Sequence, residues 1–190
     1  MVEPTDLTDE MLAICVQKGD AEAFGTLVER YEAKLLRYGR KFTSQTEDIK
    51  DLVQNVFMKA YENIKSFDTT ARFSPWVYRI AHNVFVSHLR QKSRNPLLLV
   101  DFDTFIAHPV YDDPHEREIE QKEIKKLVTR GLDELSPKYR EVLTLYYIED
   151  LPYKEIAEIL QVPIGTVGIR IKRARDTLRS KYKHNPYGPE

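Results

Sequence analysis

Apolar residues recur along most of the chain at intervals of three and four positions, and polar residues fill the positions between them. This spacing places the apolar side chains on one face of an α-helix. No stretch alternates apolar and polar residues over the useful length of a strand. The pattern therefore predicts an all-α protein, with helices in the first half over residues 8–18, 21–42, 47–64 and 75–92.

The same stripes predict the core. On helices 21–42 and 47–64 the apolar faces are Phe24, Leu27, Val28, Tyr31 and Leu35, and Ile49, Leu52, Val53, Val56, Phe57, Ala60, Tyr61 and Ile64. On helix 75–92 we expect the core to take Trp76, Val77, Ile80, Ala81, Val84 and Leu89, and solvent to take Tyr78, Arg79, His82, Asn83, Ser87 and Arg90. The preceding stretch, 66–73, lacks periodicity and is predicted to be a loop, after which Ser74 caps the helix and Pro75 occupies its first position.

The composition changes after residue 92. Residues 93–117 contain three prolines and interleave acidic with apolar residues, which predicts an extended linker. Helical spacing returns over residues 118–183, where "SP" again precedes a helix. The helix "YKEIAEIL", the turn "QVP" and a last helix over Ile164–Tyr182 describe a helix-turn-helix. The predicted organisation is a helical domain over 8–92, a linker over 93–117 and a second helical domain over 118–183.

Charge is distributed unevenly, although the 190-residue chain has a formal net charge of only -1. Residues 25–92 carry twelve basic and seven acidic residues, and residues 121–190 carry fourteen and ten. Residues 93–120 carry two and seven. Two basic blocks separated by an acidic segment favour a polyanionic partner, while a solvated charged face on each amphipathic helix is the alternative.

Several protein classes are disfavoured by the sequence. The single cysteine, Cys15, excludes an intramolecular disulfide framework. The start "MVEPTDLTDE" is acidic and polar, unlike a signal peptide, and no apolar run approaches the length of a membrane span. We therefore expect a cytoplasmic protein with no membrane partner.

The last helix combines an apolar stripe with a concentration of basic residues. The inward stripe is predicted to be Ile164, Val167, Ile171, Ala174 and Leu178. At 100° per residue, Thr166, Ile169 and Arg173 point to the opposite side, with Arg170 and Lys172 on the flanks. A recognition helix needs such a front, because side chains there reach phosphates and base edges in the major groove. An ordinary solvated helix end explains about half of the charges further along equally well.

Four ordered blocks of this sequence together resemble the extracytoplasmic-function (ECF) class of bacterial RNA polymerase sigma factors, within the sigma-70 family. The resemblance covers about residues 21–183 and is more specific than a helix-turn-helix alone. The blocks are "DLVQNVFMKAYENIKSF", "FSPWVYRIAHNVF", "LSPKYREVLTLYYIEDLPYKEIAEILQVPIGTV" and "RIKRARDTLR".

The resemblance implies a role for each domain. The first, sigma region 2, is expected to bind the clamp of RNA polymerase core and to read and melt the minus-10 promoter element. The second, sigma region 4, is expected to read the minus-35 element and to touch the polymerase flap. The implied partners are the beta and beta-prime subunits and promoter DNA, and an anti-sigma factor or a recruiting protein is a further candidate. The acidic linker is expected to thread the polymerase channels, imitating RNA phosphates, or to be a plain tether.

The resemblance also implies site residues. The clamp contact maps to Asp51, Gln54 and Asn55; the family usually has an acid at Asn55, so one charge-assisted hydrogen bond is expected to be weaker. The loop 66–73 matches the family loop that captures a base flipped out of the non-template strand. Its expected aromatic slot is Phe67 and Phe73, which are equally suited to closing the core. The other expected minus-10 residues are Arg72, Arg79, His82, Asn83 and Arg90.

The recognition helix departs from the family pattern. Where the family commonly reads T-V-K-S-R, this chain has Thr166, Val167, Gly168, Ile169 and Arg170. A basic phosphate contact and a polar base reader are missing, although Ile169 is able to touch a thymine methyl group. We therefore expect weak or unusual minus-35 reading. The expected minus-35 contacts are Thr166, Ile169, Arg170, Lys172 and Arg173.

Two other function classes compete with this interpretation. A stand-alone helix-turn-helix regulator explains the second domain but leaves "SPWVYRIAHN" in the first unexplained. An enzyme would need a site such as Cys15 or the metal-ligand types His108, Asp112, Asp113 and His115. Those four lie in a proline-broken acidic segment with no supporting second shell in view. We therefore predict a non-enzymatic protein without a metal or other cofactor.

Overall fold

The computed structural model describes residues 7–92, 128 and 131–183. The chain divides into two compact units, residues 1–101 and 102–190, and each is described by itself. Every regular element within the described ranges is helical, which confirms the all-α prediction. The predicted linker, 93–117, falls outside the described residues.

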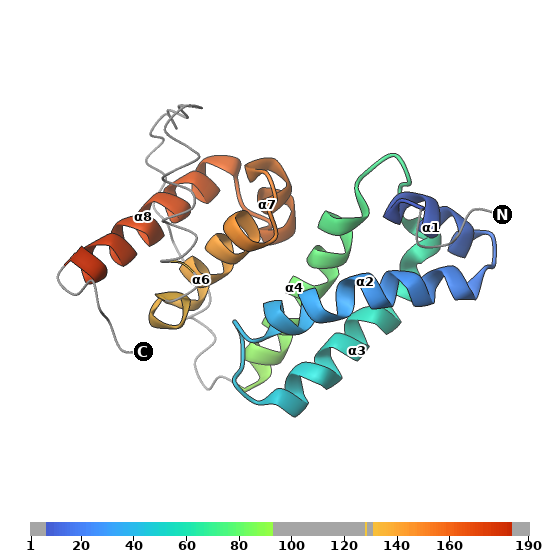
Figure 1. Cartoon of the computed structure of the whole chain (residues 1–190), viewed down its shortest axis with the longest axis horizontal. Coiled ribbons are helices and arrows are strands. Elements are labelled where there is room, and N and C mark those ends of the chain that lie inside the picture. Colours follow the sequence, from blue (N-terminus) through green and yellow to red (C-terminus); the bar gives the residue numbers. More distant parts are fainter. Residues whose placement is uncertain (1–6, 93–127, 129–130, 184–190) are drawn as a thin grey trace. The chain divides into compact units, whose positions relative to one another are not determined.

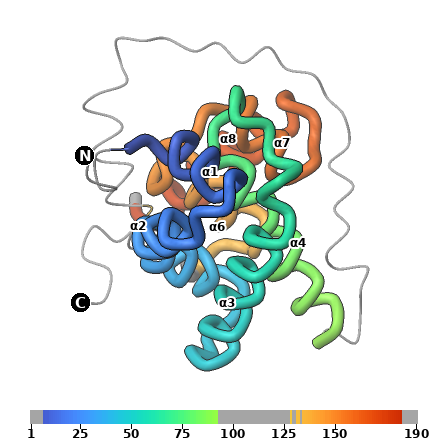
Figure 2. The backbone as a smooth tube through the Cα atoms, turned by 90° about the vertical axis from the view of Figure 1, so that its right-hand side faces the viewer, coloured from blue at the N-terminus to red at the C-terminus, as the bar shows by residue number. Residues whose placement is uncertain are grey.

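Unit 1 is a helical bundle in which α2 and α3 run side by side, α4 packs on α3, and α1 lies against α2 (Figure 1, Figure 2). Its elements agree with the sequence pattern to within a few residues. The C-terminus of α2 lies three residues earlier than predicted. The elements are α1 (Asp9–Gln17), α2 (Ala21–Gly39), α3 (Thr46–Asn63), the short 3-10 helix η2 (Ile64–Ser66) and α4 (Phe73–Lys92).

Local capping explains where the first two helices begin. The Thr8 hydroxyl accepts a hydrogen bond from the Met11 amide at 3.2 Å and so caps α1. Gly19 then turns the chain with a φ of 103°, a conformation that favours glycine. One residue later, Asp20 caps α2 by accepting hydrogen bonds from the amides of Glu22 and Ala23.

The start of α4 differs from the prediction. The helix begins at Phe73, so Ser74 lies inside it rather than capping it. The Phe73 amide instead donates a 3.0 Å hydrogen bond to the Glu10 carboxylate of α1. A carboxylate at a helix N-terminus is favoured because it pairs an orphan amide and complements the helix dipole. This cap is invisible to local sequence reasoning, because its two partners are 63 residues apart.

The core of unit 1 is rich in aromatic rings. Tyr78 was predicted to face solvent, and this is wrong, since its side chain is 1% exposed. Its ring meets that of Tyr38 edge-on at 5.3 Å, and Phe85, which the predicted stripe omitted, is fully buried beside Tyr38. The buried face of α4 therefore includes Tyr78 and Phe85, which pack against Tyr38 of α2. The half-buried positions include Trp76, Ile80 and Leu89, which were predicted to be core.

Over residues 132–183, the described part of unit 2 runs from a 3-10 turn through two short helices to a long one. The predicted bounds of the helix-turn-helix are confirmed to within one residue. Its described elements are η4 (Leu132–Glu134), α6 (Pro137–Leu143), the π-helical turn η5 (Thr144–Ile148), α7 (Tyr153–Leu160) and α8 (Ile164–Lys183).

The turn between α7 and α8 is tight. Gln161 takes the left-handed conformation, with a φ of 54°, and closes α7. The Val162 amide then donates to the Ala157 carbonyl, and the Thr166 amide donates to the Pro163 carbonyl at the start of α8. These bonds set the direction in which α8 leaves the turn.

The core of unit 2 is mainly aliphatic. Val167, Ile171, Ala174 and Leu178 are buried along α8, as the stripe predicts. Ile164 was expected to join them but is 55% exposed. It is the first residue of α8, one turn before the buried positions of the stripe begin at Val167.

Candidate nucleic-acid interface

A polar groove lies between α3 and α4 of unit 1. It encloses a cavity of about 500 Å³. Amide and hydroxyl side chains line it together with one lysine, and short apolar side chains form the remaining wall. The lining residues are Leu52, Asn55, Lys59, Asn63, Ile80, Asn83, Val84, Ser87, His88 and Gln91. Amides both donate and accept, so this lining offers hydrogen-bond partners for a base edge and a cation for a phosphate.

One end of this groove carries a small electrostatic cluster. The Asp48 carboxylate pairs with Lys92, and its Oδ2 lies 3.7 Å from Nε2 of His88. The hydrogen bond from Lys92 is the largest influence holding the pKa of Asp48 below its usual value. Nε2 of His88 is buried and has no hydrogen-bond partner among the described residues.

The loop that joins α3 to α4, Phe67–Arg72, has internal order. Oδ1 of Asp68 accepts hydrogen bonds from the amide and the hydroxyl of Thr70, at 2.9 and 2.8 Å. These two bonds keep the pKa of the Asp68 carboxyl below its usual range. The Ala71 amide also donates to the Asp68 carbonyl at 3.0 Å. The middle of the loop is therefore a closed turn whose residues 70–72 are exposed.

An aromatic cluster lies where the loop meets the start of α4. Phe67, Phe73 and Trp76 have ring centroids 5.1 to 5.5 Å apart. Phe67 and Phe73 are only 5% and 2% exposed. Their rings close the end of the unit 1 core.

A second groove lies between α2 and α3 and is mostly apolar. Its cavity is about 710 Å³ and is lined by residues that include Phe24, Phe57 and Gln54. Two large apolar residues at its edge are exposed, Met58 by 64% and Tyr61 by 49%. Exposed apolar side chains that gather in one groove are typical of a protein-binding surface.

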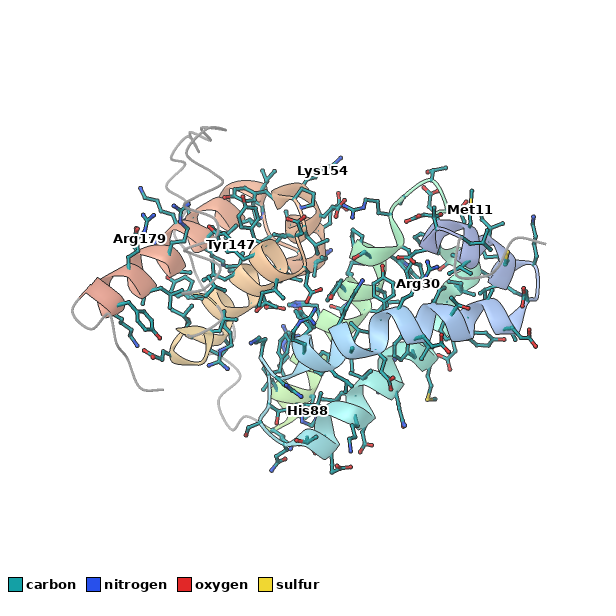
Figure 3. All side chains as sticks on the ribbon, viewed as in Figure 1. Met11, Arg30, His88, Tyr147, Lys154 and Arg179 are labelled. Carbon is teal, nitrogen blue, oxygen red and sulfur yellow. The ribbon has the colours of Figure 1, made fainter. Side chains whose placement is uncertain are left out.

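In unit 2, the front of α8 is polar and faces away from the buried stripe. Lys172 and Arg173 are exposed, and Thr166, Ile169 and Arg170 are half-buried. Arg179 on α8 and Lys154 on α7 are labelled in Figure 3. The half-buried position of Ile169 leaves part of its side chain available for an apolar contact.

Comparison with known proteins agrees with this geometry. Residues 27–95 match the family model of sigma-70 region 2, and residues 125–178 match that of sigma-70 region 4. The ECF RNA polymerase sigma-E factor of Haemophilus influenzae is 36% identical over 181 residues, covering 92% of this chain and 95% of that protein. The ECF RNA polymerase sigma factor SigW of Bacillus subtilis is 33% identical over 177 residues, covering 88% and 93%.

The chain belongs to the ECF sigma factors. It is a sigma factor that binds RNA polymerase core and directs promoter recognition in transcription initiation. Solved structures show the same fold. CnrH, in complex with the cytosolic domain of CnrY, superposes with a TM-score of 0.66 and 26% identity over 93% of this chain and 98% of that one. RpoE of Bartonella quintana, in complex with the anti-sigma factor NepR, gives a TM-score of 0.63 at 24% identity, covering 87% and 99%.

Within this ECF sigma factor, the three residues predicted to contact the polymerase clamp are all exposed on α3, at helical spacings of three and four that make Asp51 a neighbour of both Gln54 and Asn55. Gln54 lines the apolar groove, whereas Asn55 lines the polar groove next to α4. Asp51 is exposed and lines neither groove. The three positions therefore form one continuous exposed strip between the two grooves, and their contact with the polymerase clamp stays a prediction.

The predicted minus-10 residues are also dispersed. Of the seven, Asn83 lines the polar groove. Arg72, Arg79 and Arg90 are exposed, and His82 is half-buried. Phe67 and Phe73 lie in the aromatic cluster, as the core alternative describes, so any contact with a base needs the loop to move. Their part in base capture stays a prediction.

Sequence reasoning missed most of the polar groove. Lys59, Asn63 and Gln91 were not singled out, and Ser87 was only placed near solvent. A signal was present, because polar side chains recur at helical spacing on facing sides of helices 47–64 and 75–92. The signal was not recognised because amide side chains are common on exposed helix surfaces. They indicate a groove only when a second helix is known to face them.

Residues 7–92, 128 and 131–183 contain no group of three or more His, Cys, Asp or Glu side chains suited to hold a metal ion. No helix in that part of the chain combines the length and the hydropathy needed to cross a bilayer. His108, Asp112, Asp113 and His115 lie outside the described residues.

Proposed function

We propose that unit 1 binds polymerase core through the apolar groove of α2 and α3 and holds an unpaired minus-10 base in the polar groove of α3 and α4. The observation that carries this proposal is the separation of the two grooves on opposite sides of α3. Gln54 lies in one and the adjacent Asn55 in the other, since neighbouring residues point about 100° apart on a helix. One helix can then contact protein and DNA at the same time.

The polar groove suits an extruded base better than duplex DNA. A flipped base needs hydrogen bonds to its Watson–Crick edge and apolar walls for its ring faces. Asn55, Asn63 and Asn83 supply the first, and Ile80 and Val84 supply the second. Lys59 adds a positive charge for the strand backbone. The exposed Arg72, Arg79 and Arg90 extend this charge along the strand.

A pair of matched variants tests the division of labour. Asn83→Ala is expected to weaken binding of the holoenzyme to single-stranded minus-10 DNA about fivefold to a hundredfold, the range for one base contact. It should leave the affinity of the chain for polymerase core unchanged. Gln54→Ala is expected to do the reverse. If both variants weaken both activities equally, the two grooves do not have separate roles.

Unit 2 is proposed to read the minus-35 element with the front of α8. Lys172 and Arg173 are the contacts with the greatest exposure, and Thr166, Ile169 and Arg170 are closer to the body of the unit. Gly168 is buried and, as a glycine, has no side chain to offer DNA. Weak minus-35 reading follows from these features. Transcription from promoters with swapped minus-35 elements tests it, and a strong dependence on that element would refute it.

We further propose that this sigma factor catalyses no reaction of its own and acts in the cytoplasm. We also propose that an anti-sigma factor holds it inactive. The reactions of RNA synthesis belong to the polymerase. The support for an anti-sigma partner is that RpoE of Bartonella quintana was solved with the anti-sigma factor NepR, on a related fold.

A further inference from the structure

Helix α1 touches both ends of the loop Phe67–Arg72. At the entry to the loop, Nε2 of Gln17 donates hydrogen bonds to the carbonyls of Ile64 and Phe67, at 2.8 and 2.9 Å. At the exit, the Glu10 carboxylate accepts from the amide of Phe73 at 3.0 Å. Glu10 and Gln17 are seven residues apart, so they lie on nearly the same face of the helix.

These three backbone groups lie at helix ends, and among the described residues only the Ile64 carbonyl also has a backbone partner, the Phe67 amide at 3.1 Å. The carbonyls of Ile64 and Phe67 lie where α3 and η2 end, and the Phe73 amide lies where α4 begins. Backbone groups at helix ends lack intrahelical partners. Gln17 pairs with the Phe67 carbonyl and adds a second bond at the Ile64 carbonyl, and Glu10 pairs with the Phe73 amide. The chain is therefore fixed on both sides of the loop by a helix that is remote from it in sequence.

Helix α1 is itself anchored to the body of unit 1. The Asp9 carboxylate accepts hydrogen bonds from Nη1 of Arg30 at 2.7 Å and from the Tyr31 hydroxyl at 2.6 Å. Burial and the hydrogen bond to Asp9 raise the pKa of the Tyr31 phenol well above its usual value, so the phenol stays protonated as the donor. The ring of Tyr31 meets that of Phe73 at 5.4 Å. Met11 on α1 and Arg30 on α2 are labelled in Figure 3.

No residue of α1 lines either groove of unit 1. Its contacts to the loop therefore serve the loop's position. The inner turn of the loop is already closed by Asp68 and Thr70. A loop that is held at both ends and closed in the middle needs little ordering when a DNA strand arrives, and avoiding that ordering improves affinity.

We propose that Glu10 and Gln17 are positioning residues for base capture, and that α1 sets the sequence preference of the minus-10 contact without touching DNA. The inference rests on the proposed function of the polar groove, whose positive charge the exposed Arg72 of the loop extends along the strand. Loosening either end of the loop lets it sample conformations that do not present residues 68–72 to the strand. Discrimination between bases then falls, whereas the polymerase-binding groove is unaffected.

The test uses the full chain assembled with polymerase core, and the probe is a pool of short single-stranded DNAs of random sequence. Wild-type holoenzyme is expected to enrich a preferred base at one position. Gln17→Met, which keeps the length of the side chain but removes the donor of both hydrogen bonds, is expected to lower that enrichment by about fivefold or more, since one lost hydrogen bond alone corresponds to about fivefold. Glu10→Ala should do the same, and Glu10→Gln, which keeps an acceptor, should restore most of it.

A matched control separates positioning from general loosening of α1. Thr8→Ala removes the cap of this helix without touching the loop. It should keep the wild-type base enrichment even where thermal unfolding occurs earlier. Equal loss of enrichment in Thr8→Ala and Gln17→Met would overturn the inference, because only helix stability would then matter.

The same pool distinguishes failure of the inference from failure of the proposed function. If wild type enriches a base and Asn83→Ala abolishes the enrichment while Gln17→Met and Glu10→Ala retain it, the role of α1 is refuted and the groove stands. If wild-type holoenzyme enriches no base, base capture in unit 1 is refuted and the role of α1 falls with it.

Discussion

The two units stabilise their binding surfaces in different ways. The largest fully buried side chains of unit 1 include Tyr31, Tyr38, Phe73, Tyr78 and Phe85, whereas those of unit 2 are leucines and an isoleucine. In unit 1 the aromatic packing continues to the base of the loop between α3 and α4. In unit 2 the buried stripe and the basic front are on opposite sides of α8.

This difference separates the consequences of substitution. In unit 1, the rings that hold the loop are also core side chains, so a change there alters stability and DNA contact together. In unit 2, an exposed residue on the front of α8 contributes little to the core. Its substitution is therefore expected to alter DNA contact without altering stability. Loss of activity is thus weak evidence for a direct DNA contact at Phe73 and much stronger evidence at Arg173.

The largest expected effect is at Phe73. Phe73→Ala removes a ring that is 2% exposed and contacts Phe67, Trp76 and Tyr31. Deleting a buried phenylalanine side chain costs about 3–5 kcal/mol in the free energy of unfolding. Urea unfolding followed by the fluorescence of Trp76, the only tryptophan of the chain, measures this cost.

The adjacent Arg72 is exposed and supplies the control. Arg72→Ala is expected to change the free energy of unfolding by less than about 0.5 kcal/mol. A Phe73→Ala protein of wild-type stability that no longer binds single-stranded DNA would break the comparison. Phe73 would then be part of the binding surface and not of the core.

A smaller effect is expected at Gly39, where α2 meets α3 and α4. A Cβ atom there would lie 2.8 Å from Cγ2 of Ile49 and 2.8 Å from Cζ of Phe85. Gly39→Ala should therefore destabilise unit 1 by about 1–3 kcal/mol through overpacking. Gly25→Ala is the matched control on the same helix, because its Cβ would meet nothing within 4 Å. It should stabilise the helix by about 0.5–1 kcal/mol. Thermal unfolding of both variants measures the difference in sign.

On the front of α8, the effect is expected to appear in DNA binding and not in folding. Arg173→Ala should weaken minus-35 binding by about 1–3 kcal/mol, the range for loss of one specific contact. The free energy of unfolding should change by less than about 0.5 kcal/mol, because Arg173 is exposed. Promoter binding and urea unfolding of the same preparation provide the two values. A large loss of stability would show that the front and the core of unit 2 are not separate.

The smallest effect is expected from the closed turn of the loop, and it depends on pH. Hydrogen bonds from Thr70 lower the pKa of Asp68 in the folded chain, so the ionised carboxylate favours folding. This contribution is fully present above the ordinary pKa of an aspartate and is lost as the pH falls through the lowered value. The stability difference between wild type and Asp68→Ala should therefore shrink with acidification. Thr70→Val, which keeps the backbone bond to Asp68, should show a smaller difference at neutral pH. Urea unfolding between pH 7 and about pH 3 measures both, and a difference that grows in acid would contradict this sign.

The sequence predicted helices well wherever the determining signal was local. The helix α7 and the start of α8 lie where the apolar spacing and the turn residues place them. The prediction was less accurate where a distant partner decides. Glu10 caps α4 from another helix, and Tyr38 draws the ring of Tyr78 into the core. The sequence around the start of α4 does not point to Glu10, and the sequence around Tyr78 does not point to Tyr38.

The candidate site was less predictable than the fold. Motif resemblance led to Asn83 and to the residues of α8, because those positions lie within recognisable blocks. It did not lead to Lys59, Asn63 or Gln91, because the polar groove exists only once α3 and α4 face each other. The same holds for Gln17, whose two bonds reach residues 47 and 50 positions away.

The left-handed Gln161 between α7 and α8 has a consequence for how precisely α8 is presented to DNA. A left-handed residue other than glycine is disfavoured by about 1–2 kcal/mol, so this hinge is held at an energetic disadvantage by the packing on either side. Glycine at this position would remove the penalty and at the same time admit many more backbone angles. The native glutamine thus lowers stability slightly and, compared with glycine, restricts the range of angles at which α8 can approach DNA.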